Sequence, residues 1–104
     1  MKTILVTGAS SGFGKATSIR FAQKGWNVIA WARRMERMRD WRNELSTEIQ
    51  NQVFLQEVDV RDGDAVTAAL SALPHNFQAI DVLINNAGLA AGKDPIHEAS
   101  MDDW

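Results

Sequence analysis

The sequence contains no cysteine and no tyrosine among its 104 residues, and only two prolines. Without cysteine, disulfides, thiolate metal sites and cysteine nucleophiles are excluded. No apolar run approaches the roughly 20 residues that span a membrane. The run Thr3-Ile4-Leu5-Val6 is also shorter than the apolar core of a signal peptide, which needs about 7–15 residues. We therefore expect a soluble cytoplasmic protein.

Neither sign of charge dominates, because 11 Lys and Arg stand against 13 Asp and Glu, for a formal net charge of -2. Proteins that bind nucleic acid or anionic membranes carry a basic surface, so neither partner is expected. The acidic pairs, Asp62 with Asp64 and Asp102 with Asp103, stand where helices are predicted to begin. The two histidines are isolated and predicted at the surface. We therefore predict no metal site and a small molecule as partner.

Short apolar runs alternate with segments of helical periodicity along the whole chain. Strands are predicted at 3–7, 27–32, 53–57 and 81–85, and helices at 13–24, at 35–45 and from Asp62 to Pro74. Strands that are apolar throughout and separated by helices indicate a parallel sheet covered on both faces. Right-handed crossovers then predict an α/β fold, a Rossmann-type doubly wound sheet with strand order 3-2-1-4.

Three glycines follow the first predicted strand, in the stretch TGASSGFG from Thr7 to Gly14. This place is the carboxyl edge of the sheet, beside the topological switch point. One glycine can take a positive φ, another lets a pyrophosphate approach the backbone, and a third lets helix and strand pack closely. The helix amino terminus favours phosphate, and Ser10 and Ser11 can add hydroxyl donors. We predict a nucleotide site at Gly8, Gly12 and Gly14; the alternative is an ordinary glycine-rich turn.

The end of the second predicted strand indicates which nicotinamide cofactor is bound. NAD-binding proteins place an acid there to hold the ribose 2′-hydroxyl, but this position is Ala32, followed by Arg33 and Arg34. An arginine can bind a 2′-phosphate through two hydrogen bonds. The sequence therefore favours NADP. The alternative is that the arginines begin a solvated helix face, on which i, i+4 ion pairs account for Arg37, Arg39 and Arg42.

The glycine stretch resembles the cofactor motif of the short-chain dehydrogenase/reductase family. Asn85-Asn86-Ala87-Gly88 is similar to that family's second signature, and Asp59-Val60 also matches. Phe13 and the tail NNAGLAAGKDPIHEASMDDW resemble the branch of NADP-dependent enzymes that oxidise serine, allo-threonine and related 3-hydroxy acids. The expected cofactor-binding set is Gly8, Ser10, Ser11, Gly12, Phe13, Gly14, Arg33, Arg34, Asp59, Val60, Asn86, Ala87 and Gly88.

The resemblance implies particular roles for the later residues of this set. Asp59 would hydrogen-bond the adenine amino group, and Val60 would flank the ring; turn chemistry ahead of the next helix explains Asp59 equally well. Asn86 would stabilise the sheet and border the ribose, with Ala87 and Gly88 leaving room for the cofactor. The alternative is a simple Asn-Gly loop.

The resemblance also implies hydride transfer between NADP(H) and a secondary alcohol or carbonyl compound. In the family, a tyrosine in a Y-x-x-x-K motif exchanges the hydroxyl proton, downstream of the second signature. This chain contains no tyrosine, so no catalytic residue is assigned, and residues 1–104 alone are expected to be inactive. The alternative function is a non-catalytic NADP-binding module. The intact protein is expected to be a homo-oligomer, as family members often are.

Two features suggest that the sheet continues beyond this sequence. The strand predicted at 81–85 would form an open apolar edge, which proteins usually avoid. Residues 100–104, SMDDW, resemble a helix start, with a capping Ser followed by acids. We expect residues 1–104 to be an NAD(P)-binding Rossmann domain, incomplete in this chain, and the amino-terminal portion of a longer single-domain enzyme.

Overall fold

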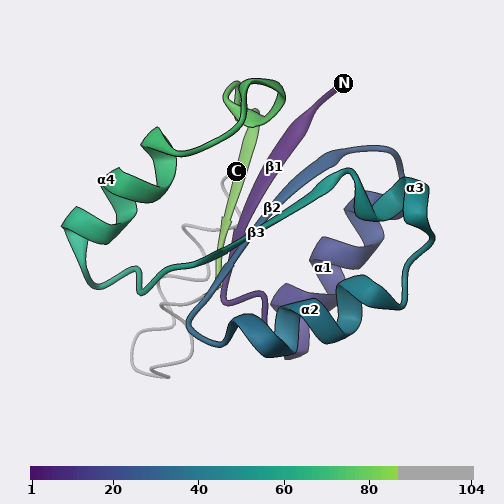
Figure 1. The fold of residues 1–104 in the computed structure, drawn as a ribbon, viewed down its shortest axis with the longest axis horizontal. Helices are drawn as coiled ribbons and strands as arrows, with labels where there is room; N and C mark the ends of the chain where they lie inside the picture. Colours follow the sequence, from purple (N-terminus) through teal and green to yellow (C-terminus); the bar gives the residue numbers. More distant parts are fainter. Residues whose placement is uncertain (87–104) are drawn as a thin grey trace.

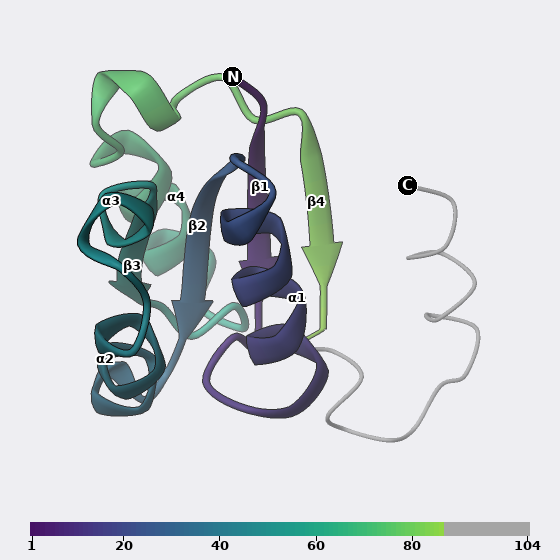
Figure 2. The same cartoon turned by 90° about the vertical axis from the view of Figure 1, so that its right-hand side faces the viewer.

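The structure, a computed structural model, describes residues 1–86 and contains one four-stranded parallel sheet (Figure 1). Its strands are β1 (Thr3–Thr7), β2 (Asn27–Ala32), β3 (Val53–Glu57) and β4 (Val82–Asn85). They lie in the order β3-β2-β1-β4, which confirms the predicted topology. All four strands point the same way, so their carboxyl ends meet at one edge of the sheet (Figure 2).

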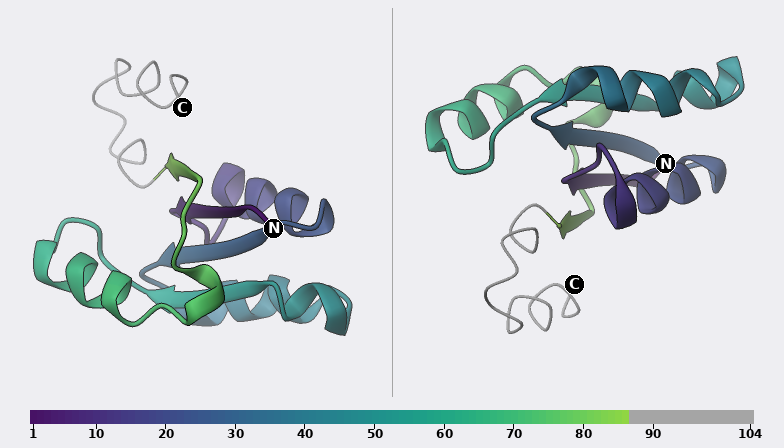
Figure 3. Two further views of the ribbon diagram at one scale, coloured as in Figure 1. Left: turned by 90° about the horizontal axis from the view of Figure 1, so that it is seen from above. Right: turned by 90° about the horizontal axis from the view of Figure 1, so that it is seen from below.

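Helices cover the two faces of the sheet. The helices α1 (Gly12–Gln23) and α2 (Met35–Asn43) and the short α3 (Thr47–Gln50) lie on one side, and α4 (Gly63–Ser71) lies on the other with the 3-10 turn η1 (His75–Phe77). The two views of Figure 3 show α1 and α4 well apart on either side of the strands. None of the helices within residues 1–86 is long and apolar enough to cross a bilayer.

Two apolar clusters fill the space between the sheet and its helices, because successive side chains of a strand point to opposite faces. Ile4 and Val6 of β1 face the α1 and α2 side, where Met38 and Trp41 are buried. Leu5 faces the α4 side. The second cluster is built from Leu5, Ile29, Trp31, Val58, Ala69, Leu73 and Phe77.

The start of β1 is held by residues that lie far along the chain. The backbone N–H of Thr3 donates to a carboxylate oxygen of Asp81 at 2.8 Å, and the Asp81 N–H donates to the Thr3 carbonyl at 2.8 Å. These bonds set the register in which Ile4 pairs with Val82 and Thr7 with Asn85. β1 is therefore an inner strand, with β2 on one side and β4 on the other.

The three strands from β1 to β3 have the bounds that the sequence predicts, and β4 begins one residue later than predicted. The helix predicted at 35–45 ends at Asn43, and two short elements, α3 and η1, were not predicted. Asp62 caps α4 as expected, since its carboxylate accepts hydrogen bonds from the N–H groups of Asp64 and Ala65. Gly25 follows Lys24, the C-cap residue of α1, and has φ +92°, the left-handed conformation in which glycine commonly ends a helix.

Candidate functional site

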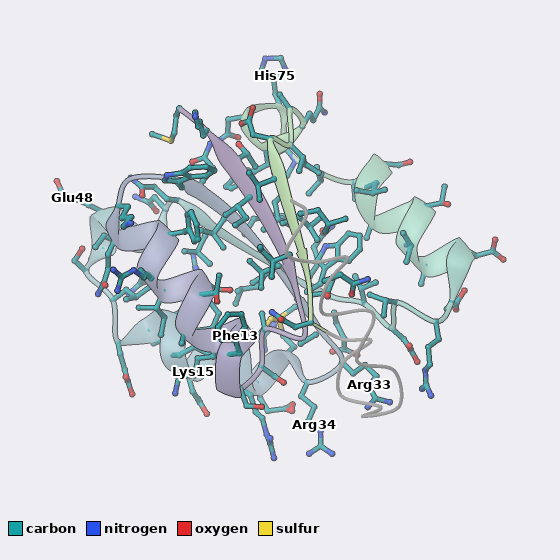
Figure 4. The ribbon with its side chains drawn as sticks, turned by 180° about the vertical axis from the view of Figure 1, so that it is seen from behind. Phe13, Lys15, Arg33, Arg34, Glu48 and His75 are labelled. Carbon is teal, nitrogen blue, oxygen red and sulfur yellow. The ribbon has the colours of Figure 1, made fainter. Side chains whose placement is uncertain are left out.

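The predicted cofactor residues that the structure describes gather at the carboxyl edge of the sheet. The loop between β1 and α1 runs below this edge (Figure 2). In Figure 4 the side chains of Phe13, Arg33 and Arg34 lie at this same end, whereas His75 lies at the opposite end. Segments that are distant in sequence therefore converge where ligands bind in open α/β sheets.

The glycines of the loop have distinct structural roles. Gly8 has φ +63° and Gly12 has φ +59°, a left-handed conformation that side chains disfavour. A Cβ added at Gly14 would lie 2.1 Å from the Gly8 carbonyl oxygen, so the helix packs directly on the loop. A Cβ at Gly12 would meet nothing within 4 Å. The predicted turn conformation is confirmed, and the predicted close packing of the helix is found against the loop residue that follows β1. Gly12 borders open space.

The amino terminus of α1 is not neutralised by its own side chains. Ser11 is the N-cap residue, but its side chain makes no capping hydrogen bond, and no acidic residue lies in the first turn. Ser10 is half-buried and Ser11 is exposed, while Phe13 is 69% exposed. The first-turn N–H groups and the positive end of the helix dipole can therefore attract an anion.

Arg33 and Arg34 follow β2 directly and are exposed. Arg34 is the N-cap residue of α2. Within residues 1–86, neither guanidinium group forms a hydrogen bond or ion pair. Ala32, which holds the position of the NAD-specific acid, is buried. Two cations without a partner in the described part of the chain thus follow β2, at the position where an acid would repel a phosphate.

The expected ion pairs along α2 are not formed, which corrects that prediction. Among the described residues, the only ion pair joins Arg61 to Asp59. The Arg42 guanidinium donates instead to the Gln50 and Val53 carbonyls, with its Nε 3.1 Å from the Val53 oxygen. Backbone carbonyls at the end of α3 and the start of β3 offer a partly buried acceptor, whereas an i, i+4 carboxylate is solvated.

Asp59 follows the end of β3 and forms a compact turn with Arg61. Its Oδ1 accepts hydrogen bonds from the Arg61 backbone N–H and Nε at 3.0 and 3.1 Å, and its Oδ2 accepts one from Nη2 at 2.9 Å. These bonds, with a smaller contribution from the charge of Arg33, lower the pKa of Asp59 to about 2. The turn chemistry anticipated for Asp59 is therefore present.

Val60 and Asn86, the other predicted residues that the structure describes, also follow strand ends. Val60 is half-buried and packs on the α4-side cluster. The amide oxygen and nitrogen of Asn86 are buried and have no hydrogen-bond partner among the described residues. Thr7 at the end of β1 donates to the Asn85 side-chain oxygen at 2.9 Å. Ala87 and Gly88 lie outside the described residues.

Sequence reasoning missed one buried contact at the glycine loop. The indole Nε1–H of Trp41 donates to the Ala9 carbonyl at 2.9 Å. Trp41 also packs in the core, where it is 2% exposed. The signal that could have indicated the bond is chemical, since a buried indole N–H needs an acceptor.

The fold and the carboxyl edge of the sheet define the class of protein. It is a Rossmann-type doubly wound fold with a glycine-rich loop between its first strand and first helix. The family model described as short chain dehydrogenase matches residues 2–104. The chain belongs to the short-chain dehydrogenase family.

Relatives and solved structures agree with this assignment. The chain is 45% identical over 101 residues to the NADP-dependent 3-hydroxy acid dehydrogenase YdfG of Escherichia coli strain K12, covering 97% of this chain and 39% of that protein. It is 47% identical over 102 residues to serine 3-dehydrogenase of Agrobacterium fabrum, with coverages of 98% and 39%. The closed form of a serine dehydrogenase complexed with NADP+ superposes with a TM-score of 0.71 at 38% identity, over 78% of this chain and 31% of that one.

A short-chain dehydrogenase from Bacillus anthracis gives a TM-score of 0.74 at 34% identity, over 83% of this chain and 34% of that chain. The chain spans about two fifths of the length of the curated relatives that it matches. The relatives therefore support the fold and the family over most of this chain, and the activity of the whole protein belongs to the proposal that follows.

Proposed function

We propose that this chain supplies the NADP-binding portion of an NADP-dependent oxidoreductase that interconverts a secondary alcohol and a carbonyl compound. Serine and other 3-hydroxy acids are the proposed substrate class, because relatives with these names are 45–47% identical to the chain. The observation that carries the proposal is the pair of arginines at a strand end without an acid, which have no hydrogen-bond or ion-pair partner within residues 1–86. Bound NADP would supply the hydride-accepting nicotinamide.

The glycine loop suits a pyrophosphate on two grounds. Gly12 borders open space where a Cβ would meet nothing, so phosphate oxygens can reach the backbone there. The first turn of α1 has uncapped N–H groups, because the Ser11 side chain does not use them. Fixed N–H donors at a helix start can bind a phosphate even where no fully charged cationic side chain is present. We assign Gly8, Gly12, Gly14, Ser10, Ser11 and Phe13 to this part of the site.

The arginines suit the 2′-phosphate that distinguishes NADP from NAD. Arg33 and Arg34 are exposed and have no competing partner in the described part of the chain. The charge of Arg33 acts on the Asp59 carboxylate, which already pairs with Arg61. Arg33 can therefore bind a phosphate without first breaking an ion pair.

Asp59 can bind the adenine amino group even though Arg61 holds it. A carboxylate offers about four acceptor positions. Three hydrogen bonds from Arg61 reach it, two at Oδ1 and one at Oδ2, which leaves one position at Oδ2. We assign Asp59 and Val60 to the adenine, and Asn86, Ala87 and Gly88 to the ribose side.

A non-catalytic NADP-binding module is the second candidate, and one observation favours it. The chain lacks the tyrosine through which the resemblance implies proton exchange, so its described residues would bind cofactor without supplying an acid or base. Reading the frame beyond Trp104 separates the two, because an in-frame Y-x-x-x-K motif supports the enzyme and its absence supports the module.

The proposal is tested on the intact protein with two measurements. Titration with NADPH and NADH should show a strong preference for NADPH. Incubation with NADP+ and serine or other 3-hydroxy acids should then produce NADPH, followed by its absorbance. Equal affinity for NADH would contradict the cofactor assignment, and tight NADPH binding without turnover on any alcohol would favour the binding module.

A further inference from the structure

The backbone of Ala9 is held by hydrogen bonds at both its N–H and its carbonyl. Ala9 is fully buried in the loop between β1 and α1. Its N–H donates to the carbonyl of Trp31, at the end of β2, at 3.0 Å. Its carbonyl accepts the indole N–H of Trp41, on α2, at 2.9 Å. Both backbone polar groups of Ala9 are therefore bound by elements outside the loop.

The Ala9 carbonyl lies between two conformationally constrained positions of the loop. The preceding residue, Gly8, holds a positive φ, and its carbonyl oxygen packs against Gly14 at the start of α1. The next positive φ is at Gly12. Rotation of the peptide group between Ala9 and Ser10 would therefore displace the backbone that leads to Gly12 and to the first-turn N–H groups.

The donor of the hydrogen bond to the Ala9 carbonyl lies far from Ala9 in the sequence. Trp41 is 32 residues further along the chain and lies on the helix whose N-cap is Arg34. Trp41 is only 2% exposed and packs in the cluster that contains Met38 and Val28. An aliphatic residue could fill such a core position, but only a side chain with a donor can also satisfy the Ala9 carbonyl.

We propose that Trp41 is a positioning residue, which holds the Ala9 peptide so that the loop from Gly8 to Gly12 keeps its phosphate-binding shape. This inference rests on the proposed NADP binding. Without the indole N–H, the Ala9 carbonyl is buried and unsatisfied, and the loop relieves this by moving toward water. Such movement misaligns the N–H groups that meet the pyrophosphate, while the arginine end of the site keeps its place.

The test uses ligands that occupy different parts of the site in the intact protein. Trp41→Phe removes the donor and keeps an aromatic side chain. We expect the Kd for NADPH to rise about threefold to tenfold, the factor that one neutral hydrogen bond supplies. The Kd for adenosine 2′-monophosphate, which has no pyrophosphate, should stay unchanged. An isosteric second variant carries 3-benzothienylalanine at position 41, which replaces the indole N–H with sulfur and keeps the shape of the core.

Trp31→Phe is the matched control. It also removes a buried indole donor, which binds the Gln56 side chain at 2.8 Å on the other side of the sheet, and it keeps the backbone carbonyl that holds Ala9. It should lower stability without a selective loss of NADPH affinity. Hydrogen exchange of the peptide covering residues 8–14, without ligand, should accelerate in both position-41 variants and not in Trp31→Phe.

The outcomes separate this inference from the proposed function. If the unmodified protein binds NADPH and both position-41 variants bind it equally well, Trp41 only packs and the positioning role is wrong. Parallel losses for NADPH and adenosine 2′-monophosphate would also overturn it, because they would indicate general destabilisation. If the unmodified protein binds neither ligand, the proposed function fails and the positioning role fails with it, whatever the exchange data show.

Discussion

At the scale of single residues, the glycines of the loop differ in why they cannot be replaced. Gly14 is constrained by contact, since its added Cβ would lie within 3 Å of two backbone atoms of Gly8. Gly12 is constrained by its φ of +59° alone. Gly8, with φ +63°, shares the constraint of Gly12, so the structure separates two glycines needed for their backbone conformation from one needed for close packing.

Replacing these glycines with alanine should separate the two constraints. Gly14→Ala should destabilise the protein by about 3 kcal/mol or more, because rigid backbone must move to admit the methyl group. Gly12→Ala should cost about 1–2 kcal/mol for a left-handed alanine. Chemical denaturation of the intact protein measures both, and equal losses would mean that Gly14 is not a close-packing position. Gly12→Val should additionally weaken NADPH binding in the folded protein.

Arg33 provides the test of cofactor choice. A charge-assisted hydrogen bond to a 2′-phosphate contributes about 1.5–3 kcal/mol, so Arg33→Ala should weaken NADPH binding roughly tenfold to a hundredfold. NADH, which has no such phosphate, should bind nearly as before. Arg37→Ala, which removes an exposed arginine further along α2, is the control. Equal losses for both cofactors in a titration would show that Arg33 does not contact the phosphate.

At the scale of elements, the turn between β3 and α4 is stabilised by charge. The Asp59 carboxyl has its pKa lowered to about 2, chiefly by its hydrogen bonds from Arg61. A carboxyl whose pKa is lower in the folded state contributes stability above its unfolded pKa, near 4, and loses that contribution as the pH falls toward 2. The ion pair is solvent-exposed, so this contribution is small.

Arg61→Gln should therefore raise the Asp59 pKa toward its ordinary value of 3.8. It should remain somewhat below that value, because the backbone N–H of residue 61 and the charge of Arg33 persist. The carboxyl carbon shift of Asp59, followed by NMR across acidic pH, measures the change. Arg37→Gln should leave it where it is, and an unchanged titration in Arg61→Gln would refute the turn geometry.

The strands could be predicted from the sequence more accurately than the short helical elements. The buried strands were predicted to the residue from β1 to β3 because a parallel strand covered on both faces is apolar along its whole length. α3 and η1 were missed because each is at most four residues long, too short to show a period. Gln56 is a polar residue in the otherwise apolar run of β3, and its amide joins the Trp31 indole to the Ala69 carbonyl.

For the candidate site, sequence reasoning reached the residues whose chemistry is local and missed those whose partners are distant. The glycines and arginines could be predicted because they follow strand ends whose positions the apolar runs define. The Trp41 contact with Ala9 could not, because nothing in a one-dimensional pattern brings residues 9 and 41 together. Arg61 and Asp59 are only two residues apart in the sequence. The sequence shows that both charges are present, but it does not distinguish an ion pair from two separately solvated side chains.

At the scale of the whole molecule, residues 1–104 expressed alone should show no dehydrogenase activity. No tyrosine is present to exchange the proton, and a positioned general acid or base is worth about 10²–10⁴ in rate. A version extended into the downstream frame is the comparison, with NADP+ and a panel of 3-hydroxy acids as reactants. Turnover by the short version at a rate near that of the long one would mean that residues assigned to binding perform the chemistry.

The short version should also associate with itself in solution. Within residues 1–86, β4 pairs only with β1, and Leu83 on this strand is 41% exposed. A strand with one unpaired side and an exposed apolar residue is a template for pairing with another chain. Sedimentation at increasing concentration measures this, and the extended version is the control; a short version that stays monomeric throughout would contradict the expectation.

The bonds between Thr3 and Asp81 have a consequence for how the chain folds during synthesis. β1 is made first, and β2 can pair with it after a connection of about twenty residues. Its other edge must wait until Asp81 and β4 have left the ribosome, because these partners are 78 residues away from Thr3. Closing so long a loop is slow and costs entropy before any contact is gained. Until β4 has been made, the strand that will lie inside the sheet is an outer one, so its free edge has to be kept from other chains.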